Sequence, residues 1–241
     1  MNAPVDFDDI SVEDVSRHFG RRKALSRITF RAERGSILGL LGPNGAGKST
    51  MLSLLATIMR PTNGRIRFGR FAADGEEHAR SLRGRIGVLG HDLFLYPELT
   101  ALENLTFFAG LYALPDAKRR ALAALDRAGL ADRADDPVGS FSRGMRQRVA
   151  LERALIHDPR LVLFDEPFTG LDDASAAALI ARLKALRGEG AILVVATHDL
   201  DLAEGLLDQA VFLRNGRLAE AVERPEGLRS TYRAVMARRD G

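Results

Sequence analysis

A glycine-rich segment carries the strongest chemical pattern in the chain. It reads GPNGAGKST, from Gly42 to Thr50, and it directly follows the apolar run GSILGLL. Glycines let successive backbone N–H groups turn toward phosphate oxygens, Lys48 can reach the β- and γ-phosphates, and the Ser49 hydroxyl suits Mg²⁺. The segment therefore predicts binding of a nucleoside triphosphate with Mg²⁺. The residues expected to contact it are Gly42, Pro43, Asn44, Gly45, Ala46, Gly47, Lys48, Ser49 and Thr50.

An acidic pair ends a second apolar run, LVLFDEP. Asp165 would lie at the carboxyl edge of a parallel strand, beside the phosphates, where its carboxylate can hold Mg²⁺ through water. Glu166 would then be placed to polarise an attacking water. An acidic pair at a strand end is more often a surface turn, so only its combination with the glycine-rich segment points to triphosphate hydrolysis.

A third feature is a helix start that suits an anion but has no lysine. In SFSRGMRQRVALERALIHDP, Ser142 and Gly144 stand at the beginning of a run with apolar residues at helical spacing. The first N–H groups of a helix have no partner within it, so a hydroxyl placed there suits phosphate oxygens. This stretch contains neither a glycine-rich loop nor a lysine. The sequence therefore predicts half of a phosphate site, with the other half supplied from elsewhere.

Five motifs occur in the order and spacing of one known family, and together they resemble the ATP-binding cassette (ABC) family from about Ile10 to Ala221. They are GPNGAGKST, FSRGM, LVLFDEP, FTGLDD and ATHD. In that family two cassettes pair head to tail, and the helix after the signature motif faces the γ-phosphate held by the other cassette. The resemblance implies that Ser142 and Gly144 act in this way, opposite Lys48 of a second cassette.

The resemblance also implies roles for single residues. Phe19 is similar to the aromatic residue that stacks on adenine, and Asp172 to the aspartate of the loop at the dimer seam. His198 is similar to the switch histidine that contacts the γ-phosphate, and His91 stands where most relatives have the glutamine of the Q-loop. The alternatives are an ordinary phenylalanine for Phe19, a buried structural histidine for His198 and a surface residue one position out of register for His91. The expected catalytic residues are Lys48, Glu166 and His198, and the expected metal ligands are Ser49 and Asp165.

Two positions of the signature depart from the family pattern. Arg143 replaces the usual first glycine and Met145 replaces a glutamine, whereas Ser142 and Gly144 remain. With LGH, LTALENL and FSRGMRQR, the substitution at His91 looks most like the ATP-binding subunit of the haem exporters of cytochrome c maturation. Related drug, polysaccharide and ion exporters share much of this pattern.

The motifs need particular elements to position them. We expect an α/β fold, namely a P-loop NTPase with a RecA-like core, an N-terminal antiparallel β lobe and a helical subdomain inserted at about 92–159. Strands are expected in ISVEDVS, ALSRITFRAE, GSILGLL, PTNGRIRFG, GRIGVLG, RLVLFDEP, AILVVATHD and both arms of QAVFLRNGRLAEA. Helices are expected from Lys48 to about Met59, in TALENLTFFAGLYAL, DAKRRALAALDRAGL and SRGMRQRVALERALIHD, from Asp173 to Arg187, in LDLAEGLLD and near the C-terminus.

Composition limits the setting. The chain has 241 residues, a formal net charge of +3 and no cysteine, which excludes a disulfide framework or a thiolate metal site and favours an intracellular location. The N-terminus lacks the pattern of a signal peptide, and the longest apolar runs fall far short of the ~20 residues that span a bilayer. Short basic runs such as Arg21-Arg22-Lys23 are usually solvated, so nucleic acid is not an expected partner. We expect a single ATP-binding domain, 1–241, peripheral to the cytoplasmic face of the cell membrane.

Two classes of function fit these observations. The first is the ATP-hydrolysing subunit of an ABC membrane exporter, with integral membrane permease subunits and a second cassette, identical or different, as partners. Haem export is the specific prediction, and a drug, polysaccharide or ion exporter is the alternative. The second class is a non-transport ABC ATPase of translation or DNA repair, which usually has two cassettes in one chain or a long coiled-coil insertion. One cassette without a heptad insertion favours transport.

Overall fold

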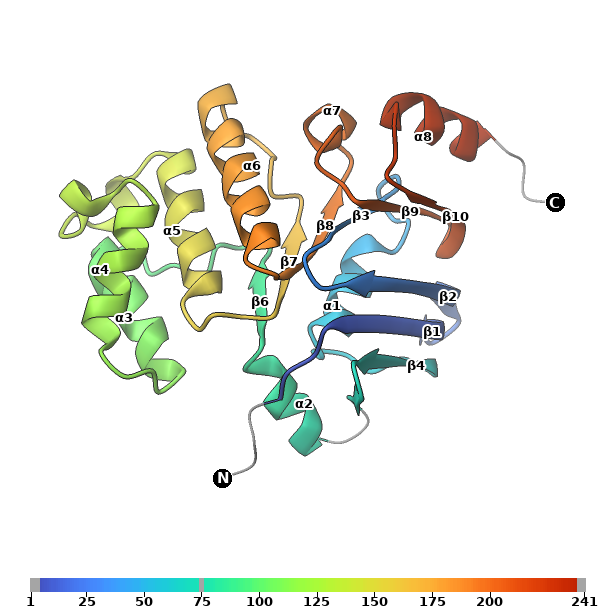
Figure 1. The fold of residues 1–241 in the computed structure, drawn as a ribbon, viewed down its shortest axis with the longest axis horizontal. Coiled ribbons are helices and arrows are strands. Elements are labelled where there is room, and N and C mark those ends of the chain that lie inside the picture. Colours follow the sequence, from blue (N-terminus) through green and yellow to red (C-terminus); the bar gives the residue numbers. More distant parts are fainter. Residues whose placement is uncertain (1–4, 74–75, 238–241) are drawn as a thin grey trace.

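A six-stranded sheet forms the centre of the molecule (Figure 1). The computed structural model describes residues 5–73 and 76–237. The strand order is β10-β9-β3-β8-β7-β6, and only the β9–β10 pair is antiparallel. The bounds are β3 Ile37–Leu41, β6 Ile86–Leu89, β7 Leu161–Asp165, β8 Ile192–Thr197, β9 Gln209–Arg214 and β10 Arg217–Glu223. Every residue of β3 and β8 is buried, which explains why these strands appear in the sequence as continuous apolar runs.

A second, antiparallel sheet lies beside the first and confirms the predicted N-terminal β lobe. Its order is β2-β1-β4-β5, with β1 Asp9–Phe19, β2 Arg22–Glu33, β4 Asn63–Phe68 and β5 Phe71–Ala72. Alternate residues of β2 are buried, as expected for a sheet with one solvated face. Its buried residues share one apolar core with the central sheet and with helix α1, Lys48–Leu55.

Three helices, α3 Ala101–Leu111, α4 Ala117–Arg127 and α5 Arg143–Leu155, make a lobe beside the β6 edge (Figure 1). They share their own apolar core, which includes Leu105, Leu125 and Val149. The predicted capping box begins α3, because Thr100 Oγ1 accepts from the Glu103 N–H at 3.1 Å and Glu103 accepts from the Thr100 N–H at 2.9 Å. The remaining helices are α2 Glu76–Arg83, α6 Asp173–Gly188, α7 Leu200–Ala203 and α8 Leu228–Ala237.

The helix predicted from Lys48 to about Met59 is shorter in the structure. Helix α1 ends at Leu55, and Thr57 adopts a φ of 56°. A β-branched residue in this left-handed region cannot continue a right-handed helix. The chain therefore turns toward β4 four residues earlier than the apolar spacing suggested.

The helix predicted in LDLAEGLLD is also largely wrong. Helix α7 stops at Ala203, and Gly205 has a φ of 69°. The Glu204 carboxylate accepts hydrogen bonds from the N–H groups of Gly227 and Leu228, at 2.8 and 2.6 Å, where α8 begins. This long-range cap fixes the end of α7, and apolar spacing alone does not reveal it.

None of the helices in the described part of the chain combines the length and apolar character needed to cross a membrane.

Candidate nucleotide-binding site

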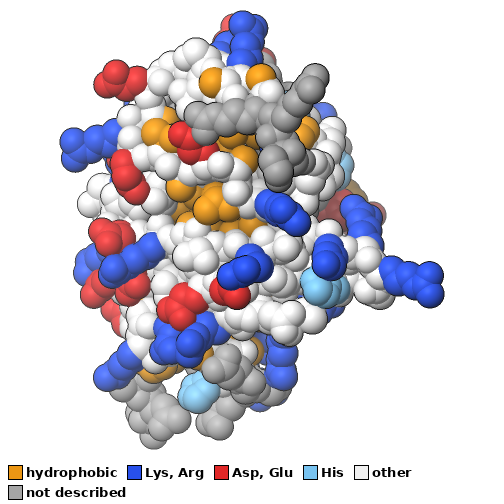
Figure 2. Space-filling model, turned by 90° about the vertical axis from the view of Figure 1, so that its right-hand side faces the viewer, with side chains coloured by type: hydrophobic (Ala, Val, Ile, Leu, Met, Phe, Trp, Pro, Cys, Tyr) orange, Lys and Arg blue, Asp and Glu red, His pale blue; other side chains and the backbone are white. Residues whose placement is uncertain are grey.

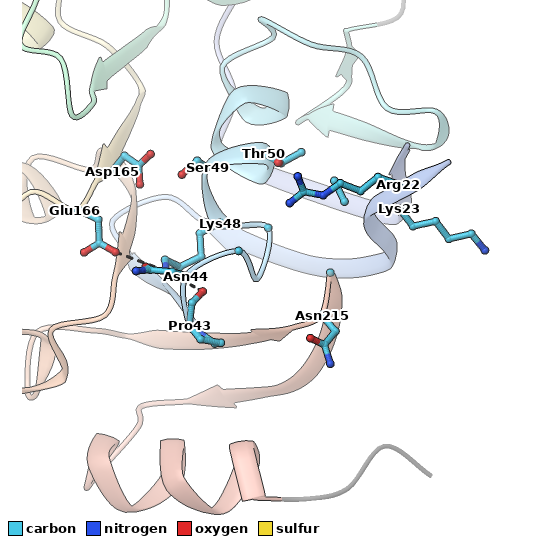
Figure 3. Close-up of a pocket in the computed structure, with 14 residues that line it drawn as sticks. Arg22, Lys23, Pro43, Asn44, Lys48, Ser49, Thr50, Asp165, Glu166 and Asn215 are labelled. Atoms are coloured by element: carbon cyan, nitrogen blue, oxygen red, sulfur yellow. Dashed lines mark hydrogen bonds and ion pairs between the residues drawn. The ribbon is translucent and has the colours of Figure 1, made fainter. Parts of the chain in front are cut away.

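A pocket of about 340 Å³ opens where β3 and β7 end, at the carboxyl edge of the central sheet (Figure 3). This is the edge at which parallel α/β sheets bind ligands. The glycine-rich segment connects β3 to α1 along one wall, and Gly42, Gly45 and Gly47 all have positive φ angles, which only glycine adopts without strain. The lining residues are Arg22, Lys23, Ala24, Pro43, Asn44, Gly45, Gly47, Lys48, Ser49, Thr50, Asp165, Glu166, Asn215 and Gly216.

Lys48 is buried at the start of α1, with 7% of its side chain exposed. Its Nζ donates to the carbonyl oxygens of Gly42 and Pro43, at 2.7 and 3.4 Å, and lies 3.6 Å from Glu166 Oε1. These contacts hold the ammonium against the loop that would surround phosphate oxygens. The structure therefore brings Lys48 and Glu166 together at this edge of the sheet.

Glu166 follows β7 and is held from several directions. Its Oε2 lies 2.8 Å from His198 Nδ1 and accepts from the His198 N–H and the Thr197 hydroxyl, each at 3.2 Å. Its backbone N–H donates to the Ala196 carbonyl at 2.8 Å, and its φ is 52°. A left-handed glutamate is strained, and such strain is concentrated at functional sites because the surrounding contacts can hold it. The structure therefore brings His198 to Glu166, and His198 is 61% exposed rather than a buried structural residue.

The two predicted metal ligands line the same pocket. Figure 3 shows Ser49 and Asp165 near each other at the start of α1 and the end of β7. Within residues 5–73 and 76–237, no group of three or more His, Asp or Glu side chains could hold a metal ion by itself. One hydroxyl and one carboxylate fit Mg²⁺, because this ion keeps several waters and takes its other ligands from the phosphates.

The residues that line the pocket include neither Phe19 nor His91, and Gly42, Ala46 and His198 are also outside that lining. Phe19, at the end of β1, is 45% exposed, and the Arg17 guanidinium lies 4.7 Å from the centre of its ring. His91 lies two residues beyond β6 and is exposed. The geometry therefore does not bring either side chain to Lys48 and Glu166.

The signature residues lie at the start of α5, away from this pocket. Ser142 is the N-cap, and its Oγ accepts from the Met145 N–H at 3.2 Å. The expectation that Ser142 opens a helix is confirmed. Asp172 caps α6 in the same way, accepting from the Ser175 N–H at 2.7 Å, and this bond holds the pKa of Asp172 below its usual value. Neither side chain is among those lining the pocket that contains Lys48.

The start of α5 packs against the segment 167–175, which directly follows Glu166 in the chain. The Arg143 guanidinium covers Gly170 so closely that a Cβ there would lie 2.6 Å from its Cζ. A Cβ on Gly144 would lie 2.5 Å from Ser175 Oγ, so any larger residue here would require the Ser175 hydroxyl to move. Gln147 Nε2 donates to the Pro167 carbonyl at 3.2 Å. The two segments therefore form one packed unit.

Several lining residues lie outside the sequence motifs. Arg22, Lys23 and Ala24 come from the start of β2, and Asn215 and Gly216 form the hairpin turn between β9 and β10. The Asn-Gly dipeptide predicted this hairpin correctly. Nothing in the sequence placed either turn at the nucleotide pocket, because that position depends on how the two sheets pack.

The comparison with known proteins decides the family. Residues 25–169, more than half of the chain, match the family described as ABC transporter. The chain belongs to the ABC transporter family. This cassette is 38% identical over 216 residues to the ABC transporter ATP-binding protein NatA of Bacillus subtilis (strain 168), with 87% of each chain covered. Cassettes of this family are the ATP-hydrolysing units of transporters, so the prediction of an ATPase is confirmed.

Other relatives are longer than this cassette. The linearmycin resistance ATP-binding protein LnrL of Bacillus subtilis (strain 168) is 34% identical over 211 residues, which cover 87% of this chain and 67% of LnrL. The Nod factor export ATP-binding protein I of Ralstonia nicotianae is 37% identical over 210 residues, which cover 86% of this chain and 65% of that protein. The match therefore spans about two thirds of these two relatives.

Solved structures support the same fold and a paired arrangement in the family. An ATP-binding subunit of an ABC transporter superposes with a TM-score of 0.83 at 32% identity, covering 94% of this chain and 99% of the other. A dimeric ATP-binding cassette in a post-hydrolysis state, bound to ADP and Pi, gives 0.80 at 26% identity, covering 90% and 99%. The predicted P-loop NTPase fold is confirmed, and ABC cassettes are known as nucleotide-bound dimers.

Proposed function

We propose that this chain is the ATP-hydrolysing subunit of an ABC exporter. One observation carries the proposal, namely that Lys48, Glu166 and His198 meet at the carboxyl edge of the sheet, with 3.6 Å between Lys48 Nζ and Glu166 Oε1 and 2.8 Å between Glu166 Oε2 and His198 Nδ1. A cation for the phosphates thus stands beside a carboxylate for the attacking water. The chain is a single ATP-binding domain in this proposal, with its helical subdomain at about 92–159.

Each pocket residue has a proposed task. Lys48 and the N–H groups of the 42–50 segment bind the phosphates, and Glu166 accepts the proton of the attacking water. His198 orients Glu166 and contacts the γ-phosphate. Ser49 and Asp165 would hold Mg²⁺, which would neutralise charge on the phosphate oxygens. Phe19 and His91 keep their proposed contacts with adenine and with the Q-loop network, although they do not line the pocket described above.

A second cassette completes the site in this proposal. Ser142 and Gly144 face the γ-phosphate of the partner cassette, and Asp172 lies at the seam between the two. The exposed N-cap of α5 supports this role, because Ser142 presents its hydroxyl and the first helical N–H groups at the surface. No feature of the described residues favours a non-transport ATPase of translation or repair.

An exposed aromatic surface supports a membrane permease as the other partner. It comprises Phe94, Tyr96, Phe107, Leu111 and Tyr112, of which Phe94 is 62% and Leu111 65% exposed. Tyr96 packs edge-on against Phe107, with ring centres 5.3 Å apart, so these two exposed rings lie together. Exposed apolar side chains that lie together mark protein interfaces. We propose that the cytoplasmic segments of a permease dock here, which places the chain at the cytoplasmic face of the cell membrane.

The names of the relatives indicate the class of the transported substrate. LnrL and the Nod factor protein carry resistance and export in their names, and these names favour export of a small molecule as the function of this chain. None of the relatives named above is called a haem exporter, so the resemblance to the haem exporters has no support from them. A drug or other small-molecule exporter is the proposed assignment.

The proposal is tested by purification and assay. The chain, purified from its source cells together with the membrane protein that it retains, should hydrolyse MgATP, and Phe94→Ser with Leu111→Ser should reduce recovery of that permease without reducing intrinsic hydrolysis. Leu122→Ser is the matched control, because Leu122 is an exposed leucine on α4 that does not belong to the proposed docking surface. Unchanged recovery of the permease with the double variant would refute the docking surface, and absence of hydrolysis by the wild type would refute the proposed function.

A further inference from the structure

An arginine outside all the family motifs points into the nucleotide pocket. Arg22 begins β2 and lines the pocket, and Figure 3 shows its side chain directed over the start of α1 toward Thr50. The side chain of the next residue, Lys23, extends away from the pocket in the same view. Successive residues of a strand point to opposite sides, which explains the difference between these two neighbours.

The position of Arg22 along the pocket identifies the part of the nucleotide that it would meet. Lys48, Asp165 and Glu166 lie together on one side of the start of α1, and Arg22 lies on the other (Figure 3). The lysine of such a loop serves the β- and γ-phosphates, so the side with the carboxylates is the γ-phosphate end. Arg22 therefore lies toward the α-phosphate and the nucleoside, beside the last residue of the phosphate-binding segment.

The charge of Arg22 is not used elsewhere in the described structure. Within residues 5–73 and 76–237, the Arg22 guanidinium has no ion-pair or hydrogen-bond partner, whereas Arg27 and Arg31 of the same strand pair with Asp14 and Asp9. Figure 2 faces the side of the molecule where the β1–β2 hairpin turns, and it shows acidic side chains mainly on the left of this face and basic ones on both sides.

We propose that Arg22 is a nucleotide-binding residue whose guanidinium contacts the α-phosphate. The proposal rests on the proposed function, because it requires that this pocket binds ATP, and it adds a residue that the motifs of the glycine-rich segment do not include. A guanidinium is always charged and presents N–H donors in a fork that matches two phosphate oxygens. Asp165 and Glu166 stay at the opposite end, so they do not compete for it.

The proposal predicts a particular kinetic pattern. The α-phosphate is present in both ATP and ADP and does not change its bonds during hydrolysis. A contact with it stabilises the bound ground state and the transition state equally, so its loss raises KM and leaves kcat unchanged. This separates Arg22 from Lys48 and Glu166, whose loss lowers kcat.

The test compares two neighbouring arginines. Arg22→Met and Arg21→Met each remove one positive charge, but Arg21 lies in the turn and does not line the pocket. Isothermal titration calorimetry with MgADP, MgGDP and a non-hydrolysable MgATP analogue should give dissociation constants about fivefold higher for Arg22→Met with all three nucleotides. Arg21→Met should stay within about twofold of wild type, Arg22→Lys should recover part of the loss, and 0.5 M salt should shrink it.

The outcomes separate this inference from the proposed function. Unchanged dissociation constants for Arg22→Met, in a wild type that binds MgADP, would overturn the role of Arg22 and leave the proposed function intact. A loss with the ATP analogue but not with ADP, or unequal losses with ADP and GDP, would overturn the α-phosphate contact in favour of the γ-phosphate or the base. If wild type itself failed to bind MgADP, the proposed function would fall.

Discussion

The His198 Nδ1 and Glu166 Oε2 atoms lie 2.8 Å apart, at the ends of two neighbouring parallel strands. The same carboxylate oxygen accepts from the Thr197 hydroxyl and the His198 N–H, each at 3.2 Å. Glu166 Oε2 therefore contacts three groups at the end of β8. The other oxygen, Oε1, lies 3.6 Å from Lys48 Nζ. The orientation of Glu166 is fixed by its surroundings, which is what a group that must align a water molecule requires.

Replacing Glu166 with Gln should separate binding from hydrolysis. Glutamine keeps the shape of the side chain and loses the negative charge that accepts a proton, so kcat should fall by about 10²- to 10⁴-fold. ATP binding should persist, and gel filtration with MgATP should show a long-lived dimer. Wild-type turnover, or only monomer in the presence of ATP, would contradict the role given to Glu166.

Replacing Lys48 with Ala should weaken nucleotide binding itself. The substitution removes the charged donor for the β- and γ-phosphates, and a charged hydrogen bond is worth about tenfold or more in affinity. Turnover should be lost with it. The check is calorimetric titration with MgADP, and circular dichroism serves as a control for folding because Lys48 is a buried residue. Hydrolysis at the wild-type rate would refute the assignment of the phosphate-binding segment.

Changing Ser142 should block hydrolysis without weakening nucleotide binding by the monomer. Ser142→Arg introduces a bulky side chain, and Ser142→Asp preserves the helix cap while placing a negative charge against the partner's γ-phosphate. Both variants should bind MgADP as the wild type does and hydrolyse ATP poorly. Wild-type hydrolysis by both would rule out a role for this helix start in the active dimer.

Mixing variants tests the head-to-tail arrangement. A dimer with one Ser142→Arg chain and one Lys48→Ala chain has one site with both defects and one site with neither. Random pairing of equal amounts makes half of the dimers mixed, so independent sites would recover about a quarter of wild-type activity. Any activity above the sum of the two separate variants supports sites shared between cassettes.

His157 should make the folding stability sensitive to acid. Burial lowers the pKa of His157 to about 4, against the ordinary 6.5, and its Nε2 already donates to the Ile86 carbonyl at 3.1 Å. Its Nδ1 has no hydrogen-bond partner among the described residues, so a proton added there would be buried and unpaired. The unfolded chain binds this proton more readily than the folded chain does. His157 therefore does not reduce the free energy of unfolding above pH 6.5, and it reduces it increasingly as the pH falls toward 4.

Urea denaturation at several pH values checks this expectation. Between pH 7 and pH 4 the wild type should lose on the order of 3 kcal/mol more than His157→Gln, which keeps an N–H donor and does not titrate. Both proteins contain the same carboxylates, so the effect of their titration on the free energy of unfolding cancels in the comparison. Parallel stability curves for the two proteins would show that His157 does not bind the additional proton on unfolding.

Features with local causes could be predicted from the sequence. The glycine-rich turn between β3 and α1, the acidic pair at the end of β7, the Thr100 capping box and the Asn215-Gly216 hairpin each follow from a few adjacent residues. The continuous apolar runs predicted buried parallel strands for the same reason. Glu166 could therefore be selected as a site residue before its partner His198 was seen beside it.

Features with long-range causes could not be predicted. Helix α7 ends early because Glu204 caps α8, and helix α2, Glu76–Arg83, was not predicted because only Ala79 and Leu82 mark its buried side within a polar stretch. Arg22 and Asn215 reach the nucleotide pocket only because the antiparallel sheet packs on the central one. Phe19 was expected at adenine on the basis of resemblance alone, and the position of its exposed ring outside the pocket was not visible in the sequence.

The packed unit of Arg143 over Gly170, Gly144 against Ser175 and Gln147 on Pro167 has a genetic consequence. A substitution in this unit should disturb the surface that carries Ser142. Through the segment 167–175, it should also disturb the position of Glu166. In a head-to-tail pair made of two copies of this chain, these surfaces would serve different nucleotides, so one altered chain would impair both sites. In that pairing, a cell making normal and altered chains equally would keep about a quarter of its pairs fully intact, and such an allele would act dominantly.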